Sequence, residues 1–199
     1  MTRSDDWLRE LEACGALRRG HFLLSSGLHS PAYVQCALLL SLPARARAAG
    51  AALGAKLRAA EIGVDSVLSP ALGGVVIGHE VAAALGVPFR FVERQGDALA
   101  LRRGFEIARG ERVAVVEDVV TTGKSTLETA AVAEAAGART VAIASILDRS
   151  GGRHGFGVPF LPLLELDLPT WRAAECPLCA AGGRPVKPGS RPQAEATRT

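Results

Sequence analysis

Short apolar runs rich in valine and isoleucine alternate along this chain with longer segments of helical character. Strands are predicted at residues 64–68, 87–92, 112–116 and 140–147, and helices at residues 43–61, 74–85 and 124–136. Apolar runs of about four to eight residues separated by helices are typical of a parallel sheet that is covered on both faces. We therefore expect an α/β fold with a doubly wound, mostly parallel sheet flanked by helices.

The two ends of the chain do not follow this alternation. Residues 4–14 predict a short amphipathic helix, and residues 21–24 and 33–40 predict extended segments on either side of a turn. The end of the chain contains Gly, Pro, Arg and Ser without periodicity, a composition typical of disorder. We expect three parts, namely a small N-terminal hood at residues 1–42, a core at residues 43–180 and a disordered tail at residues 181–199.

Composition and charge narrow the class of protein. Hydrophobic residues make up 48% of the 199 residues and charged residues 22%, which is ordinary for a folded domain. The net charge of +3 comes without a cluster of basic residues, so we expect no nucleic-acid partner. No apolar stretch reaches the ~18 residues that span a bilayer, and acids stand where a signal peptide would be apolar. We therefore expect a cytoplasmic protein with no membrane partner.

The strongest motif follows the third predicted strand. That strand ends in Glu117 and Asp118, and the turn 119–123 then leads into a helix that begins at Lys124. Backbone N–H groups and the positive end of the helix dipole form a phosphate site at such a position, and nearby hydroxyls such as that of Ser125 add donors. The two acids would repel a phosphate, so they need a partner that donates hydrogen bonds or carries positive charge. The hydroxyls of a ribose, or a ribosyl cation formed in a transition state, meet this need.

Two other interpretations of the motif are weaker. Gly123, Lys124 and Ser125 look like the end of a nucleotide-binding P-loop, but the first glycine of that pattern would fall on Asp118. An acid there would face the phosphates that the loop should bind. A capped helix with its acids in solvent explains either acid alone, but explains the whole run after a buried strand less well.

Residues 117–125 resemble the signature of the type I phosphoribosyltransferases, which use 5-phosphoribosyl 1-diphosphate. Residues 21–33 resemble the N-terminal segment of the members that act on orotate. Residues 69–74 resemble their pyrophosphate loop, and residues 147–149 resemble the segment that supplies an arginine to the orotate carboxylate. The resemblance covers about residues 8–180. Residues 101–105 and the late Cys-Pro-Leu-Cys resemble a bacterial subgroup.

The resemblance implies a reaction and its partners. A phosphoribosyl group would pass from 5-phosphoribosyl 1-diphosphate to orotate, giving orotidine 5′-phosphate and pyrophosphate in pyrimidine synthesis. Mg²⁺ would be held mainly by the donor substrate, so no protein metal ligand is expected. Family members are dimers, so a homodimer is expected, and the hood at residues 1–42 would contribute to base recognition.

The resemblance also implies roles for single residues. Asp118 and Glu117 would hold the ribose hydroxyls. The 5-phosphate would be held by Thr121, Thr122, Gly123, Lys124 and Ser125. Backbone amides for the pyrophosphate would come from Ala71, Leu72 and Gly73, in a loop where the family often has a cis peptide. Orotate would be contacted by Ser26, Tyr33, Thr121 and Arg149, whose guanidinium can donate two parallel hydrogen bonds to a carboxylate.

The sequence departs from the family in the polar segment 93–103. Many relatives carry lysines at the positions of Ser25 and Gly73 and have lysines and a histidine in this segment, which we expect to form a loop that closes over the site. Here its cations are Arg94, Arg102 and Arg103. Arginine neutralises pyrophosphate but is a poor proton donor at neutral pH. Either these arginines and Mg²⁺ support the leaving group, or the activity is weak. Two alternatives therefore stay open, a non-catalytic regulator that binds the donor and a transferase for another base.

One Cys-x-x-Cys pair, Cys176 and Cys179, stands near the end of the chain. A structural zinc usually needs four ligands, and no second pair is nearby. The pair could share a metal with a symmetry mate or with His154, but we expect a tight turn bearing two thiols. The remaining histidines, His21, His29 and His79, are expected to be ordinary core or surface residues.

Overall fold

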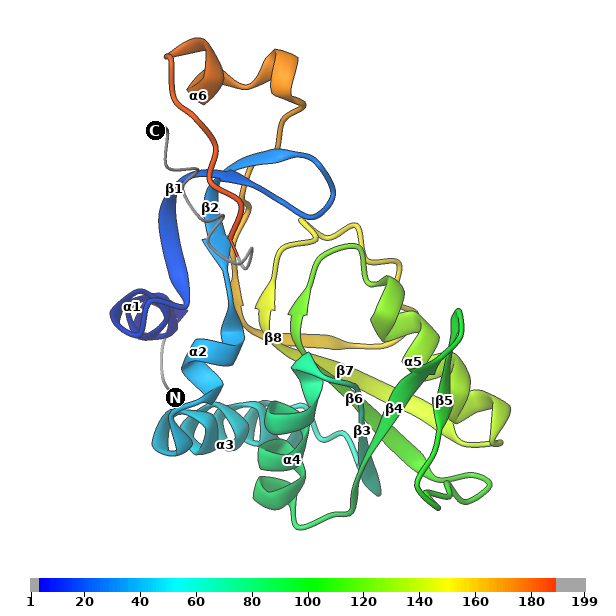
Figure 1. The fold of residues 1–199 in the computed structure, drawn as a ribbon. Helices are drawn as coiled ribbons and strands as arrows, with labels where there is room; N and C mark the ends of the chain where they lie inside the picture. The colour runs from blue at the N-terminus through cyan, green and yellow to red at the C-terminus, as the bar shows by residue number, and fades with distance from the viewer. Residues whose placement is uncertain (1–3, 189–199) are drawn as a thin grey trace, which may run out of the picture. The chain divides into compact units, whose positions relative to one another are not determined.

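The structure is a computed structural model that describes residues 4–188. The chain forms two compact units (Figure 1). The first unit contains residues 4–16 and Gln35–Asp167, and the second contains Leu17–Val34 and the residues from Leu168 onward. This division differs from the predicted boundaries at residues 42 and 180, because the chain enters the second unit twice.

A six-stranded sheet forms the centre of the first unit, with the strand order β5-β4-β3-β6-β7-β8. Every neighbouring pair is parallel except β4 and β5, which are antiparallel. The strands are β3 (Ser66–Pro70), β4 (Phe89–Gln95), β5 (Ala98–Leu101), β6 (Arg112–Val120), β7 (Arg139–Asp148) and β8 (Phe160–Glu165). The predicted α/β class with a mostly parallel sheet is confirmed.

Helices cover both faces of this sheet (Figure 1). They are α1 (Ser4–Ala13), α2 (Cys36–Leu40), α3 (Pro43–Ala59), α4 (Gly73–Leu85) and α5 (Lys124–Ala135). Helix α3 packs closely on α4, and a Cβ atom at Gly50 would lie only 2.6 Å from the Glu80 backbone carbon. Because the central strands are covered on both sides, all of β3 and residues 113–117 of β6 are buried. Of the described residues, none belongs to a helix long and apolar enough to cross a membrane.

Three local predictions were wrong. Residues 33–40 do not form one extended segment, because β2 ends at Val34 and helix α2 follows. Its Cys36, Leu39 and Leu40 are buried with helical spacing. Segment 93–103 is not a loop but the β4–β5 hairpin, with Gly96 in its turn at φ +62° and Leu99 packed on the core. Strand β6 continues past residue 116 to Val120, so both acids of the motif lie on the strand itself.

Strand β8 has no counterpart among the predicted elements. Its sequence contains Pro162, which removes a backbone donor and obscures the strand pattern. Proline is tolerated on an edge strand, and β8 is the last strand of the sheet. The side chains of Leu163 and Leu164 are buried, so this strand completes the core of the first unit.

The second unit is built on the antiparallel pair β1 (Leu17–Leu23) and β2 (His29–Val34), with a short helix α6 (Pro177–Ala180). The C-terminal segment pairs with both strands. Trp171 and His29 exchange backbone hydrogen bonds of 2.8 and 3.0 Å, and the amide of Val186 donates to the carbonyl of His21 over 2.8 Å. Residues 181–188 are therefore not the disordered segment that was predicted, because backbone pairing needs no side-chain periodicity. Residues 189–199 lie outside the described residues.

Candidate active site

The carboxyl ends of three adjacent parallel strands, β3, β6 and β7, meet at one edge of the sheet of the first unit. From β3 the chain winds to β4 on one side, and from β6 it winds to β7 and β8 on the other. The β3–β6 boundary is thus the topological switch point, where open α/β sheets bind their ligands. The loops after these strands carry the residues that the sequence singled out.

Glu117 lies at the end of β6 with only 8% of its surface exposed. The hydroxyl of Ser125 donates to its two carboxylate oxygens at 2.9 and 3.2 Å, and the hydroxyl of Thr126 donates to one of them. Burial raises the pKa of Glu117, although these hydrogen bonds act in the opposite direction. The Glu117 carboxylate therefore links the start of α5 to strand β6. In this structure the Ser125 hydroxyl donates its hydrogen bond to Glu117.

Asp118 is half-buried and faces the loop that follows β3. Its Oδ1 accepts a hydrogen bond of 2.9 Å from the amide of Val119, and burial raises its pKa. A Cβ atom at Gly73 would lie 2.7 Å from the same oxygen. A cavity of about 400 Å³ opens beside this contact and is lined by Gln35, Ala37, Leu40, Ser41, Leu72, Gly73, Val76 and Asp118.

The loop after β3 contains a cis peptide bond between Ala71 and Leu72. The amide of Ala71 donates to the carbonyl of Val92 on β4 at 2.8 Å. This amide is therefore already engaged within the sheet, which conflicts with the predicted role of Ala71 as a donor to pyrophosphate, while the roles of Leu72 and Gly73 stay predictions. Leu72 is 87% exposed, which is unusual for leucine, and it lines the cavity.

The turn between β6 and α5 needs a glycine at position 123. Gly123 has φ +76°, and a Cβ atom there would lie 2.8 Å from the Phe156 ring and 3.0 Å from the carbonyl oxygen of His154. Thr121 and Thr122 are exposed. The first amides of a helix have no acceptor within it and lie at the positive end of its dipole. The turn can therefore bind an anion through backbone donors.

Arg149 directly follows β7, and its amide donates to the carbonyl of Val120 at 2.8 Å. Its side-chain Nε is buried and has no hydrogen-bond partner among the described residues. Burial lowers the pKa of this guanidinium. A buried donor without an acceptor costs about 1–3 kcal/mol, and more when it is charged, so the side chain is suited to an anionic ligand.

The three arginines of the β4–β5 hairpin differ in their contacts. Arg103 donates to both carboxylate oxygens of Glu93, at 2.8 and 2.7 Å, and this hydrogen bonding lowers the pKa of Glu93. Arg94 forms an ion pair of 2.7 Å with Glu128 on α5. Arg102 is exposed and forms no ion pair with a described residue, although its charge also contributes to the lowered pKa of Glu93. The hairpin therefore offers one uncommitted cation rather than three.

Comparison with known proteins decides the family. The family described as "Phosphoribosyl transferase domain" matches residues 37–154. A protein of Carboxydothermus hydrogenoformans named orotate phosphoribosyltransferase is 50% identical over 176 residues, covering 88% of this chain and 92% of its own. A protein of Acidithiobacillus ferrooxidans with the same name is 52% identical over 182 residues, covering 89% and 92%.

This chain belongs to the orotate phosphoribosyltransferase family. The crystal structure of orotate phosphoribosyltransferase from Aeropyrum pernix agrees, with a TM-score of 0.67 at 25% identity, and covers 79% of this chain and 92% of its own. Membership fits the arrangement of the first unit, in which the loop after β3 and the turn after β6 meet at Asp118.

Two predicted base-recognition residues of the family belong to the second unit. The ring of Tyr33 lies 5.9 Å from that of Phe22, and the hydroxyl of Ser26 accepts a hydrogen bond of 3.4 Å from the amide of Leu28. Their contact with orotate stays a prediction.

Sequence reasoning missed two residues that shape the family site. Thr126 is fully buried and donates to Glu117, yet it looks like any polar residue at the start of a helix. Phe156 closes the space behind Gly123 from a segment more than thirty residues away. Such contacts between distant segments leave no local signal in the sequence.

Proposed function

We propose that this protein transfers the phosphoribosyl group of 5-phosphoribosyl 1-diphosphate to orotate, giving orotidine 5′-phosphate and pyrophosphate. The observation that carries the proposal is the position of Asp118, on β6 beside the anion-binding turn 121–123 and against Gly73 of the loop after β3. A carboxylate between two groups of backbone donors suits a sugar with a phosphate at each end. The identity of about 50% to proteins named for this reaction supports the choice of base.

In the proposed step, N1 of orotate loses its proton to solvent or to the departing pyrophosphate and forms a bond to the anomeric carbon of the donor as the bond to pyrophosphate breaks. The bonding electrons leave with the pyrophosphate oxygen, and positive charge develops on the ribosyl group. Asp118 accepts hydrogen bonds from the ribose hydroxyls and stabilises that charge. Glu117 holds the start of α5 in position through Ser125 and Thr126. The described residues offer positioning and charge stabilisation at the anomeric carbon, and these would supply most of the rate enhancement.

The 5-phosphate, the pyrophosphate and the orotate carboxylate each need a separate binding partner. The turn 121–123 and the first amides of α5 bind the 5-phosphate, with the exposed Lys124 nearby. The amides of Leu72 and Gly73 face the pyrophosphate, and Arg102 supplies a cation from the hairpin. Arg149 pairs with the orotate carboxylate through two parallel hydrogen bonds, which would satisfy its buried Nε.

The site suits Mg²⁺ that is brought by the donor. Mg²⁺ prefers oxygen ligands and usually keeps several waters while bridging substrate phosphates. Glu117 is occupied by two hydroxyls, whereas Asp118 has only one oxygen engaged by Val119 and is half-exposed. Asp118 would therefore hold the ion through the ribose hydroxyls or a bound water. When bound, Mg²⁺ neutralises the charge that develops on the pyrophosphate.

The expected homodimer and the cytoplasmic location stay predictions. A homodimer would let the β4–β5 hairpin of one subunit reach the site of the other. The mass of the protein in solution, measured by light scattering over a range of concentrations, tests the dimer.

One observation favours a second function, a donor-binding regulator without turnover. Two of the three hairpin arginines, Arg94 and Arg103, are already in ion pairs, and the hairpin has no lysine or histidine. A regulator of this kind would bind the diphosphate donor and leave orotate unchanged.

The loss of orotate absorbance with the donor and Mg²⁺ separates these possibilities. Uracil, hypoxanthine and adenine are measured in parallel assays. We expect turnover with orotate alone, and its loss when Mg²⁺ is chelated. Donor binding without loss of any base would support the regulator, and turnover with a different base would overturn the assigned substrate.

A further inference from the structure

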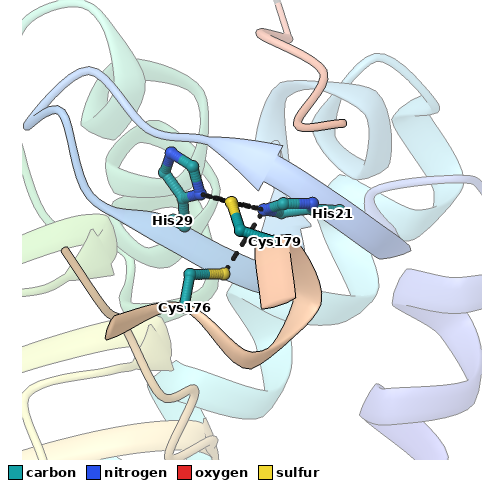
Figure 2. A group of neighbouring side chains, drawn as sticks. All are labelled: His21, His29, Cys176 and Cys179. Carbon is teal, nitrogen blue, oxygen red and sulfur yellow. Dashed lines mark hydrogen bonds between the residues drawn. The ribbon is translucent and has the colours of Figure 1, made fainter. Parts of the chain in front are cut away.

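Four side chains of the second unit converge on one point. Figure 2 shows His21 and His29 directed toward Cys176 and Cys179. The potential ligand atoms of these four residues all lie within 4.8 Å of one another. Nε2 of His21 lies 2.9 Å from Nδ1 of His29. The same nitrogen lies 3.4 Å from the sulfur of Cys176 and 3.8 Å from the sulfur of Cys179. The sulfur of Cys179 also lies 3.3 Å from Nδ1 of His29.

The fold of the second unit produces this convergence. His21 lies on β1 and His29 on β2, and an irregularity in the pairing of these strands falls between Arg19 and Phe22. A bulge of this kind re-aims side chains, here at the position of His21. Cys176 directly precedes α6 and Cys179 lies within it. The backbone bonds of Val186 to His21 and of Trp171 to His29 hold the C-terminal segment beside the hairpin.

The three sulfur–nitrogen distances are close to those between the ligands of a tetrahedral zinc ion, and the 2.9 Å between the two ring nitrogens is somewhat shorter than the ideal value. Bonds of about 2.3 Å to sulfur and about 2.0–2.1 Å to nitrogen place tetrahedral ligands roughly 3.4 Å apart for two nitrogens and roughly 3.6 Å apart for sulfur and nitrogen. Both cysteines are free thiols in the structure. Hydrogen bonding alone accounts poorly for the cluster, because a thiol is a weak donor and a weak acceptor.

We propose that His21, His29, Cys176 and Cys179 bind one Zn²⁺ ion that stabilises the second unit. Four protein ligands leave no open position, which is the mark of a structural rather than a catalytic zinc site. The proposal differs from the expected turn of two thiols, and it takes His21 and His29 rather than His154 or a symmetry mate as the further ligands. The ring of His154 instead stacks on Phe156, with 4.3 Å between ring centroids.

The small size of the second unit suggests that the ion would stabilise its fold. Its described residues number about 40, and folds of that size usually need a metal, a disulfide or a partner to be stable. The ion would join the β1–β2 hairpin to a segment that follows it by about 150 residues in the sequence. Zinc binding would thus contribute directly to the folding free energy of this unit.

Metal analysis of the purified protein, grown with zinc, tests the proposal. We expect one zinc per chain by mass spectrometry of the metal content. Protein reloaded with Co²⁺ should give the intense visible bands of a tetrahedral ion and a thiolate charge-transfer band. Cys176→Ser, Cys179→Ser and His21→Asn should each lose most of the bound metal. Cys14→Ser and His154→Asn are matched controls, because they change a thiol and an imidazole outside the cluster, and should keep one zinc per chain.

The wild-type measurements keep the test decisive even if the ligand variants fold poorly. A strong chelator should remove the zinc, expose two additional thiols to a thiol reagent and lower the melting temperature. Protein that contains no zinc and gives no cobalt bands would overturn the proposal. So would a Cys176–Cys179 disulfide in the purified protein, or iron in place of zinc.

Discussion

Gly73 and Asp118 approach so closely that a Cβ atom at position 73 would lie 2.7 Å from Oδ1 of Asp118. The loop after β3 and the end of β6 therefore fit together only while position 73 lacks a side chain. Because this contact joins the segment after β3 to the strand that precedes the turn 121–123, it fixes the position of the Asp118 carboxylate.

Gly73→Ala should move the Asp118 carboxylate without unfolding the protein, since the displaced atoms are the end of a side chain. We expect kcat/KM for orotate and the donor to fall roughly 10- to 100-fold, as a misplacement of about 1 Å can cost that much. Gly157→Ala is the matched control, because no atom lies within 4 Å of its added Cβ. Equal steady-state rates for Gly73→Ala and Gly157→Ala would show that the contact has no part in catalysis.

Arg149→Met should impair orotate binding and leave the fold intact or more stable. The variant removes a buried charge whose Nε has no partner, so the melting temperature should stay the same or rise. A lost charge-assisted hydrogen bond is worth about 1.5–3 kcal/mol, so KM for orotate should rise roughly 10- to 100-fold.

The control for Arg149 is Arg139→Met, at the exposed opposite end of β7. It should leave both KM and melting temperature near wild type. An unchanged KM for orotate in Arg149→Met would contradict the assigned contact.

Substitutions of the hairpin arginines should have different effects on kcat/KM. Arg102→Ala should lower kcat/KM roughly tenfold or more, because it removes the uncommitted cation available to pyrophosphate. Arg103→Ala should have a smaller effect on rate, since its guanidinium is engaged by Glu93 in a bidentate pair. Steady-state kinetics of the two variants, with Arg102→Lys as the charge-preserving comparison, measures the difference. A larger loss for Arg103→Ala would reverse the assignment.

Acid stability should depend on Asp65. Hydrogen bonds from the side chain and the backbone amide of Arg112 lower the pKa of Asp65 from 3.8 to about 2. A carboxyl with a depressed pKa stabilises the folded protein above the unfolded value, and this stabilisation is lost as the pH falls through the folded value. The Asp65→Asn variant should therefore lose less stability than wild type between about pH 4 and about pH 2.

Melting temperatures measured across that pH window test the role of Asp65. Asp97→Asn, an exposed acid in the hairpin turn, should follow the wild-type curve. Parallel curves for wild type and Asp65→Asn through the window would rule out the assigned contribution.

Much of the first unit could be predicted from sequence because its signals are local. The valine-rich run of β6 and the Gly-Lys-Ser start of α5 stand next to each other in the chain, so the acid pair and the anion-binding turn could be predicted together. The hairpin at residues 93–103 was missed because β5 has only four residues and charged residues at the end of β4, in the turn and after β5 make the segment look like a polar loop.

Other features depend on contacts between distant segments. The bond from the Ala71 amide to Val92 follows from the pairing of β3 with β4, so its amide seemed free in the sequence. His21 and Cys176 are 155 positions apart, and only the path of the C-terminal segment brings them together. The sequence contained all four candidate zinc ligands but gave no signal of their proximity.

Calorimetric titration of 5-phosphoribosyl 1-diphosphate with Mg²⁺ tests the central claim most directly, namely that Asp118 and the adjoining turn hold the donor. Wild-type protein and Asp167→Asn, an exposed acid outside the site, should each bind about one donor per chain, while Asp118→Asn should bind it at least roughly tenfold more weakly. Equal affinity in Asp118→Asn and wild type, or no binding by the wild-type protein, would contradict the account.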